Sequence, residues 1–108
     1  IFNHTTIRDC KGDYVIFSMS KLRNVSFNQC FLRGGGLDNC QFTNVEFEHC
    51  NLVEAELHRT SLKGIDLTSS EIAGIRIGSI PGGELKGATV TSLQALDIAR
   101  MLGITIKD

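Results

Sequence analysis

The sequence is poor in aromatic residues, in basic charge and in long apolar runs, and the last two of these bear on its class of function. It contains no tryptophan, one proline and one tyrosine, and its 11 lysine and arginine residues against 12 aspartate and glutamate residues give a formal net charge of -1. A sequence-independent nucleic-acid binder needs a strong basic excess, so we expect no direct nucleic-acid partner. No apolar run approaches the roughly 20 residues that span a bilayer, and no signal peptide is visible, so we expect no membrane partner and a cytoplasmic location. Because the chain begins with Ile1 and not with methionine, we expect a fragment or a processed product.

The four cysteines fit neither a zinc site nor a secreted disulfide framework. They are Cys10, Cys30, Cys40 and Cys50, and the sequence has no CxxC or HxxxH pair. Zinc sites use such short spacings, and disulfide frameworks belong to secreted chains. We therefore expect no metal and no cofactor. The spacing of the cysteines by multiples of ten instead indicates an internal repeat.

The repeat is five residues long. Large apolar residues occupy every fifth position without a gap, at Phe17, Leu22, Phe27, Leu32, Leu37, Phe42, Phe47, Leu52, Leu57, Leu62, Leu67, Ile72 and Ile77. Two residues before each of them stands a second series of small or β-branched residues, which includes all four cysteines. The other three positions of each unit are largely polar.

A period of five matches neither a helix face, at 3.6, nor a strand face, at 2. Two of the five positions in each unit are apolar and should face the core. This pattern predicts that each unit is a short extended segment followed by a turn of the chain, which we call a corner. If each unit turns the chain by about a right angle, four units close a coil of about 20 residues, and successive coils stack about 4.8 Å apart like parallel strands. The cysteines would then be free, buried thiols that pack as small hydrophobic residues.

With this pattern, the sequence resembles the pentapeptide-repeat family. Units such as Cys50-Asn51-Leu52-Val53-Glu54, Ala55-Glu56-Leu57-His58-Arg59 and Ile65-Asp66-Leu67-Thr68-Ser69 are similar to the small–Asp/Asn–Leu–polar–any pattern of that family. The resemblance implies an all-β fold, a right-handed quadrilateral β-helix over residues 1–91. The register breaks at residues 78–84, where Pro81, Gly82 and Gly83 indicate a loop, and Leu85 and Val90 resume the spacing shifted by three residues.

Outward charges are unevenly spread. Acidic residues gather in the middle of the chain and form a candidate docking patch for a basic groove, made of Glu46, Glu48, Glu54, Glu56 and Asp66. The face before it carries Lys21, Arg23 and Lys63 and no acid. An ordinary solvated surface is the alternative interpretation. Paired carboxylates alone are weak evidence for acid–base chemistry, so we expect no catalytic residues and no enzymatic activity.

Residues 92–108 depart from the repeat. Thr91 and Gln94 have the spacing of a capping box, and Gly103 suits a helix end, so a helix is predicted between them. Its polar residues form only a narrow stripe, which predicts burial on two sides: one against the last coil and one against a second copy. The predicted homodimer interface consists of Leu93, Leu96, Ile98, Met101, Leu102, Ile104 and Ile106, with Ile104–Ile106 as a short strand. A helix that only caps its own chain is the alternative.

This ending is similar to that of the Qnr-type and MfpA-type pentapeptide-repeat proteins of bacteria. Two segments carry the resemblance, Leu85-Lys86-Gly87-Ala88 and Leu96-Asp97-Ile98-Ala99-Arg100-Met101-Leu102-Gly103-Ile104. The resemblance implies a DNA mimic that binds a type II topoisomerase, DNA gyrase or topoisomerase IV, and confers protection from quinolones. The net charge of -1 and the small number of coils count against it. A structural or interaction scaffold with an unknown partner is the other hypothesis.

Overall fold

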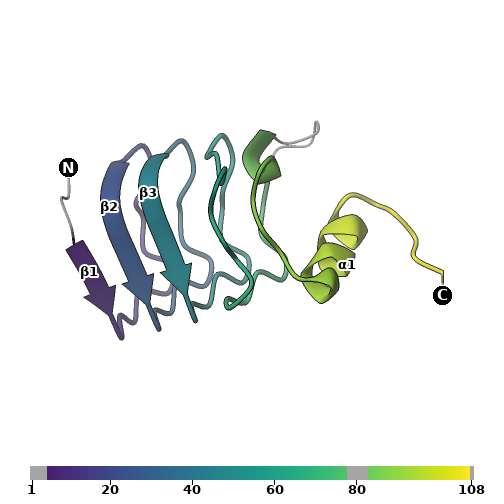
Figure 1. Cartoon of the computed structure of the whole chain (residues 1–108), viewed down its shortest axis with the longest axis horizontal. Helices are drawn as coiled ribbons and strands as arrows, with labels where there is room; N and C mark the ends of the chain where they lie inside the picture. Colours follow the sequence, from purple (N-terminus) through teal and green to yellow (C-terminus); the bar gives the residue numbers. More distant parts are fainter. Residues whose placement is uncertain (1–4, 78–82, 108) are drawn as a thin grey trace.

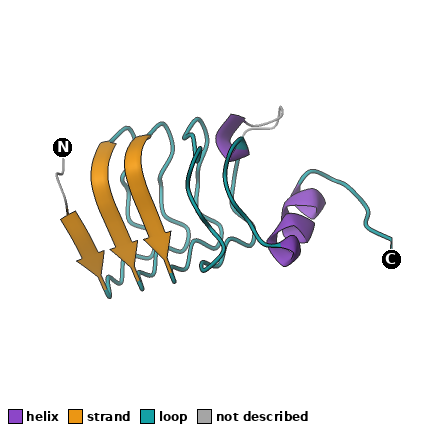
Figure 2. Ribbon diagram, viewed as in Figure 1, coloured by secondary structure: helices purple, strands orange, loops and turns teal. Residues whose placement is uncertain are grey.

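The computed structural model describes residues 5–77 and 83–107, which form a rod of 44 × 25 × 23 Å. Three strands, β1 (Thr5–Arg8), β2 (Lys21–Asn28) and β3 (Gln41–Glu48), form a parallel sheet in the order β1-β2-β3. A short 3-10 helix, η1 (Gly83–Leu85), and one α-helix, α1 (Ser92–Met101), follow. The strands lie side by side along the rod, and α1 lies beyond the last coil (Figures 1 and 2).

The predicted stack of 20-residue coils is confirmed by the strand register. Val25 pairs with Thr5 on one side and with Val45 on the other, so each partner lies 20 residues away. Isolated parallel bridges on the remaining sides, such as Phe31 to Asn51 and Glu56 to Arg76, keep the same offset. Residues 20 apart therefore stack along the rod, which gives it four faces.

Three surface regions are named from this register. The basic face holds residues 21–24, 41–44, 61–64 and 86–87. The next side holds residues 5–9, 25–29, 45–49 and 65–69, with Arg8 and Asp9 in its first coil; the acidic face is its later part, residues 45–49 and 65–69. The rear faces hold residues 10–20, 30–40, 50–60 and 70–77, on the side of the rod away from the strands.

The large apolar residues of the repeat fill the axis of the rod, as predicted. Leu22, Leu32, Leu52 and Leu62 are each no more than 2% exposed. The Phe27 ring stacks on the Phe47 ring of the next coil, with centroids 5.1 Å apart and planes only 7° from parallel. Burying such side chains removes apolar surface from water at about 25 cal/mol per Å², which makes this column the main source of stability.

The cysteines are free in the structure, as predicted, and Cys30, Cys40 and Cys50 are buried. Each buried thiol also donates to a backbone carbonyl 23 residues earlier: the Cys40 thiol lies 3.1 Å from the Phe17 oxygen and the Cys50 thiol 3.3 Å from the Phe27 oxygen. Burial raises the pKa of the Cys40 and Cys50 thiols, which keeps them protonated and able to donate. Thr60 donates a hydroxyl in the same way to the Leu37 oxygen.

The corners of the coils are of two kinds. Strands β2 and β3 run through their corners at Asn24 and Asn44, each with φ of 54°, a conformation that asparagine tolerates better than most residues. The coil below β3 instead closes tight turns, in which the Ile65 N–H donates to the Leu62 oxygen at 3.0 Å and the Ser70 N–H donates to the Leu67 oxygen at 3.1 Å. The two paths therefore differ in shape and do not pair as strands, although the offset of 20 residues continues between the two coils.

The sheet is consequently not closed, which corrects the expectation of an unbroken stack. No backbone–backbone hydrogen bond links residues 41–48 to residues 61–68, all of which are described, although the rear faces of the same two coils remain bonded. We call this break the seam. Side-chain hydroxyls bridge its two ends: Thr60 Oγ1 accepts from the Cys40 N–H at 3.0 Å, and Ser70 Oγ accepts from the Cys50 N–H at 3.1 Å.

The register resumes after the predicted break. Of the loop predicted at residues 78–84, residues 78–82 lie outside the described part of the chain and residues 83–84 belong to η1. Asp66 bridges to Thr89, an offset of 23 residues instead of 20. This offset confirms the predicted shift of three residues. Glu84 is buried, which the sequence pattern did not indicate, and its carboxylate accepts from the Arg59 N–H at 3.1 Å.

Helix α1 begins and ends with the predicted caps. Thr91 and Gln94 form the complete capping box, and the Gly103 and Ile104 N–H groups donate to the Arg100 and Ala99 oxygens, both at 3.0 Å, as in a Schellman motif. Gln94 also donates to the Leu67 and Ser70 oxygens at 2.7 and 2.8 Å, which fixes the helix to the last coil. The prediction of a short strand at Ile104–Ile106 is wrong for the single chain, where these residues adopt no regular structure.

Candidate acidic binding surface

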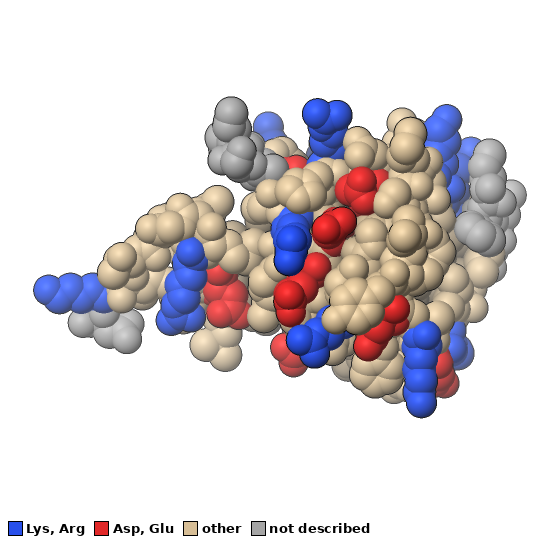
Figure 3. All heavy atoms as spheres, turned by 180° about the vertical axis from the view of Figure 1, so that it is seen from behind, with Lys and Arg blue, Asp and Glu red and all other residues tan. Residues whose placement is uncertain are grey.

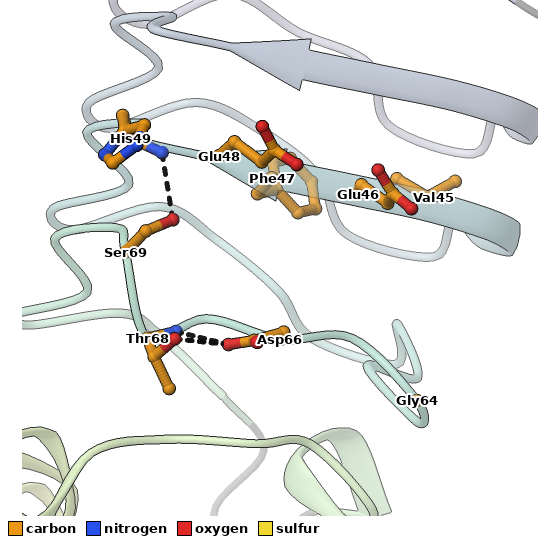
Figure 4. Close-up of a pocket in the computed structure, with 9 residues that line it drawn as sticks. All are labelled: Val45, Glu46, Phe47, Glu48, His49, Gly64, Asp66, Thr68 and Ser69. Atoms are coloured by element: carbon orange, nitrogen blue, oxygen red, sulfur yellow. Dashed lines mark hydrogen bonds between the residues drawn. The ribbon is translucent and has the colours of Figure 1, made fainter.

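The seam opens onto the acidic face as a hollow of about 410 Å³. One wall comes from β3 and the residue after it, and the other from the coil below. The lining residues are Val45, Glu46, Phe47, Glu48, His49, Gly64, Asp66, Thr68 and Ser69. Figure 4 shows Glu46 and Glu48 on the β3 side and Asp66 across the seam from them. The hollow exists because tight turns below β3 replace the strand that would otherwise have paired with it.

Three carboxylates of the predicted docking patch line this hollow, and each accepts only from uncharged donors. Glu46 accepts from the Ser26 hydroxyl at 3.4 Å, and Glu48 accepts from the Asn28 amide at 3.2 Å. These donors lie one coil earlier, at the positions that the 20-residue register places above the two glutamates. The charges of both glutamates are therefore directed outward without a cation to neutralise them.

Asp66 is held in an ionised form by its own turn. The Thr68 hydroxyl and the Thr68 N–H both donate to Asp66 Oδ1, at 2.6 and 2.8 Å (Figure 4). These two hydrogen bonds lower the pKa of the Asp66 carboxyl, with the hydroxyl as the larger cause. The lining residues contain three carboxylates and no lysine or arginine, so the hollow suits a cationic group.

The other two members of the predicted patch lie elsewhere. Glu56 is ten residues, or half a coil, from Glu46 and from Asp66, and Glu54 is eight residues from Glu46, so both belong to the rear faces. Glu54 forms an ion pair with Arg33 at 3.4 Å, and the backbone of Glu56 pairs with that of Arg76 in the next coil. Figure 3 shows the side opposite the strands, where acidic and basic side chains are intermixed. The candidate acidic site is therefore narrower than the sequence suggested and consists of Glu46, Glu48 and Asp66.

Helix α1 has no fully buried residue, and its apolar side chains divide into two groups. Ile98 and Met101 are partly buried and pack against the core of the coil stack. Leu93, Leu96, Leu102 and Ile104 are exposed, the first of them by 76%. Ile106, the last residue of the predicted dimer interface, is partly buried. The helix thus covers the last coil with one side and presents a second apolar side to solvent.

Two kinds of feature were not found among the described residues. These residues contain no cluster of three or more histidine, cysteine, aspartate or glutamate residues able to hold a metal ion. Within the same ranges, no helix is both long enough and apolar enough to cross a bilayer. The acidic hollow is open on its outer side, and the Thr68 hydroxyl within it donates to Asp66.

Sequence reasoning missed the residues that shape the hollow. Gly64 at the corner, Thr68 beside Asp66 and Ser69, whose hydroxyl accepts from the His49 N–H at 3.1 Å, form its lower wall. The Asp66-Leu67-Thr68 order could have indicated the local turn, because aspartate commonly accepts from the backbone two residues later. No sequence signal indicated that this turn would separate two coils.

A stack of 20-residue parallel coils with an apolar axis and polar outer faces defines a β-solenoid. The family model described as "Pentapeptide repeat region" matches residues 1–57, more than half of the chain, and the chain belongs to the pentapeptide-repeat family.

The chain is also similar in structure to QnrB1, a plasmid-mediated fluoroquinolone resistance protein, in two trypsin-treated variants. One has 13% sequence identity and a TM-score of 0.34, covering 95% of this chain and 70% of QnrB1. The other has 15% identity and a TM-score of 0.33, covering 96% and 69%. No curated protein sequence matched the chain.

Proposed function

We propose that this protein is a non-enzymatic, cytoplasmic binding protein whose acidic face occupies a basic, DNA-binding groove of a type II topoisomerase. Its coil stack would be the right-handed quadrilateral β-helix of its family. The single observation that carries the proposal is the set of three carboxylates, Glu46, Glu48 and Asp66, which line one hollow without a cation. The likeness of the C-terminal segment to Qnr-type and MfpA-type proteins supports the choice of partner.

The modest net charge of -1 is compatible with this role, because the charge is segregated on different faces. A partner groove meets one face of the rod and not the average charge of the protein. Complementary charge on that face raises the association rate and orients the encounter, while charges turned away from the groove contribute less because salt screens them over about 8–10 Å. We therefore expect binding to weaken as salt rises.

Dimerisation through α1 is part of the proposal. Helix α1 lies beyond the last coil at one end of the rod (Figure 1), and Leu93 and Leu96 on it are exposed, so a two-fold contact through the helix would join two coil stacks end to end. The pair would be about twice as long as one chain, which answers the objection that a single chain has too few coils to imitate a DNA segment. It would also bury Leu96 and Leu102.

The dimer is tested by replacing Leu96 and Leu102 with aspartate. A charged side chain in an apolar interface without a partner is unfavourable, so the double variant should sediment as a monomer at a concentration where the unaltered protein is a dimer. Ile16→Asp is the matched control, since Ile16 is 77% exposed on a rear face and should leave the dimer intact. Sedimentation of the unaltered protein as a monomer at high micromolar concentration would remove this part of the proposal.

The topoisomerase interaction is tested by DNA supercoiling with purified gyrase, with and without a quinolone. The unaltered protein should inhibit supercoiling or protect it from the drug. Glu46→Lys, Glu48→Lys and Asp66→Lys together should reduce this effect at least tenfold, because three attractive charges become repulsive. Lysine at Glu54, Glu56 and Glu71 makes the same total charge change on the rear faces and should reduce it much less.

If the two triple variants were equally impaired, the acidic hollow would not be the binding site. No effect of the unaltered protein at a tenfold excess over gyrase would instead favour a scaffold with another partner.

A further inference from the structure

The basic face carries a second charged surface, opposite in sign to the acidic hollow. Lys21, Arg23, Lys63 and Lys86 are all exposed on it. No exposed aspartate or glutamate occurs at residues 21–24, 41–44, 61–64 or 86–87. The nearby acid in sequence, Glu84, is buried and directs its carboxylate to the Arg59 N–H.

Within the described part of the chain, no ion pair is found for the cations of the basic face. The ion pairs found among the described residues join Arg33 to Glu54 at 3.4 Å and Arg100 to Asp97 at 3.5 Å. Neither pair involves the basic face. A surface that keeps its cations unpaired attracts anionic groups more strongly than one on which the charges alternate.

Two of these cations border a hollow of about 320 Å³. Its lining is Lys21 and Arg23 from β2 together with Gln41 and Thr43 from β3. The register pairs Lys21 with Gln41 and Arg23 with Thr43, so the four side chains stand at the corners of a rectangle of roughly 4.8 by 6.7 Å. Two cations with an amide and a hydroxyl opposite them form a set of donors suited to a carboxylate.

The basic surface continues along the rod beyond this hollow. Lys63 lies two coils further on, and its side chain lies over Gly87, where an added Cβ would come within 2.9 Å of Lys63 Cγ. Lys86 occupies the same face beside it. From Lys21 to Lys86 there are three coil steps, and the middle one crosses the seam. The span is therefore at least about 14 Å, at 4.8 Å for each paired step, a length that needs at least four or five extended residues at about 3.3 Å each.

We propose that the basic face binds an acidic, extended peptide segment of a partner protein. The segment would run along the rod, with one carboxylate in the hollow at Lys21 and Arg23 and another at Lys63 and Lys86. A peptide in this conformation presents alternate side chains to the same side and is narrow enough to stay on one face. A nucleic-acid duplex is broader, and its phosphates would also meet Glu46 and Asp66 on the adjoining acidic face. This surface is separate from the acidic hollow and does not depend on the topoisomerase proposal.

The test is fluorescence anisotropy with a labelled peptide of eight residues that alternates glutamate and serine. The unaltered protein should bind this probe, bind the glutamine version at least tenfold more weakly, and lose affinity as sodium chloride rises from 50 to 200 mM. Combined alanine substitution of Lys21, Arg23 and Lys63 should weaken binding at least tenfold. Alanine at Lys11, Arg33 and Arg76 removes the same charge from the rear faces and should change affinity less than threefold.

Three results would overturn the proposal. Absence of peptide binding at 50 mM salt would remove the site. Equal loss in the two triple variants would show non-specific attraction. Tighter binding of an eight-nucleotide single-stranded oligothymidylate, with the same dependence on Lys21, Arg23 and Lys63, would assign the face to phosphates and not to a peptide.

Discussion

Replacing Phe27 with alanine should lower the free energy of unfolding by about 3–5 kcal/mol, the usual cost of removing a buried phenylalanine. Phe27 is 1% exposed, and its ring contacts two others: Phe47 stacks on it at 5.1 Å and Phe17 meets it edge-on at 6.2 Å. The coils above and below hold Phe27 in place through the ladder, so the backbone cannot collapse into the space. A domain of this size is stabilised by about 5–15 kcal/mol, so the variant should be only marginally folded.

Chemical denaturation followed by circular dichroism measures this loss, and Phe31 supplies the control. Phe31 occupies an outward position and is 49% exposed, so Phe31→Ala should change the stability by less than about 1 kcal/mol. If Phe27→Ala cost no more than Phe31→Ala, the account of the apolar column would be wrong.

Thr60→Val should also be strongly destabilising, by about 2–4 kcal/mol, although it conserves the shape of the side chain. The Thr60 side chain is fully buried; its hydroxyl accepts from the Cys40 N–H at 3.0 Å and donates to the Leu37 oxygen. It stands at one end of the seam, where no backbone bond replaces it. Valine would leave a buried donor and a buried acceptor unsatisfied, each at a cost of about 1–3 kcal/mol, with partial relaxation expected.

Thr43→Val is the matched control for this effect. Thr43 is exposed on β3, and the same substitution there should stay within about 0.5 kcal/mol. Amide hydrogen exchange would add a local readout, because the Cys40 N–H should lose protection in the Thr60 variant first. Equal stability of the two valine variants would mean that the hydroxyl does not hold the seam together.

Much of the fold could be predicted because the five-residue repeat depends only on residues that are close together in the sequence. A large apolar residue every five positions fixes which side chains face the axis, and four units per coil fix the offset between Val25 and Val45. The three-residue shift at the C-terminal end was equally visible, since Leu85 resumes the spacing, and the caps of α1 depend on local residues alone.

The seam could not be predicted in the same way. It depends on whether a corner closes a hydrogen-bonded turn, as at Leu62–Ile65, or lets the strand run on, as at Asn44. Asn44 and Gly64 both adopt a positive φ at these corners, so this requirement alone does not distinguish the two shapes in the sequence. The acidic hollow is a consequence of this choice, which is why Thr68 and Ser69 gave no functional signal.

The division of the acidic patch has a simpler cause. Glu46 and Glu56 are close in sequence but lie half a coil apart, so they point to opposite sides of the rod. Charge counts along the chain joined them into one zone, whereas the 20-residue register separates them. A partner contacts residues that share one face of the rod, and these residues are not necessarily close together in the sequence.

A competition measurement tests the topoisomerase proposal most directly. Labelled protein is bound to purified gyrase, and unlabelled duplex DNA is then titrated into the complex. If the acidic face occupies the DNA-binding groove, excess duplex should displace the protein fully, and the Glu46→Lys, Glu48→Lys and Asp66→Lys variant should fail to bind at the start. Formation of a ternary complex, with protein and duplex bound together at saturation, would contradict DNA mimicry.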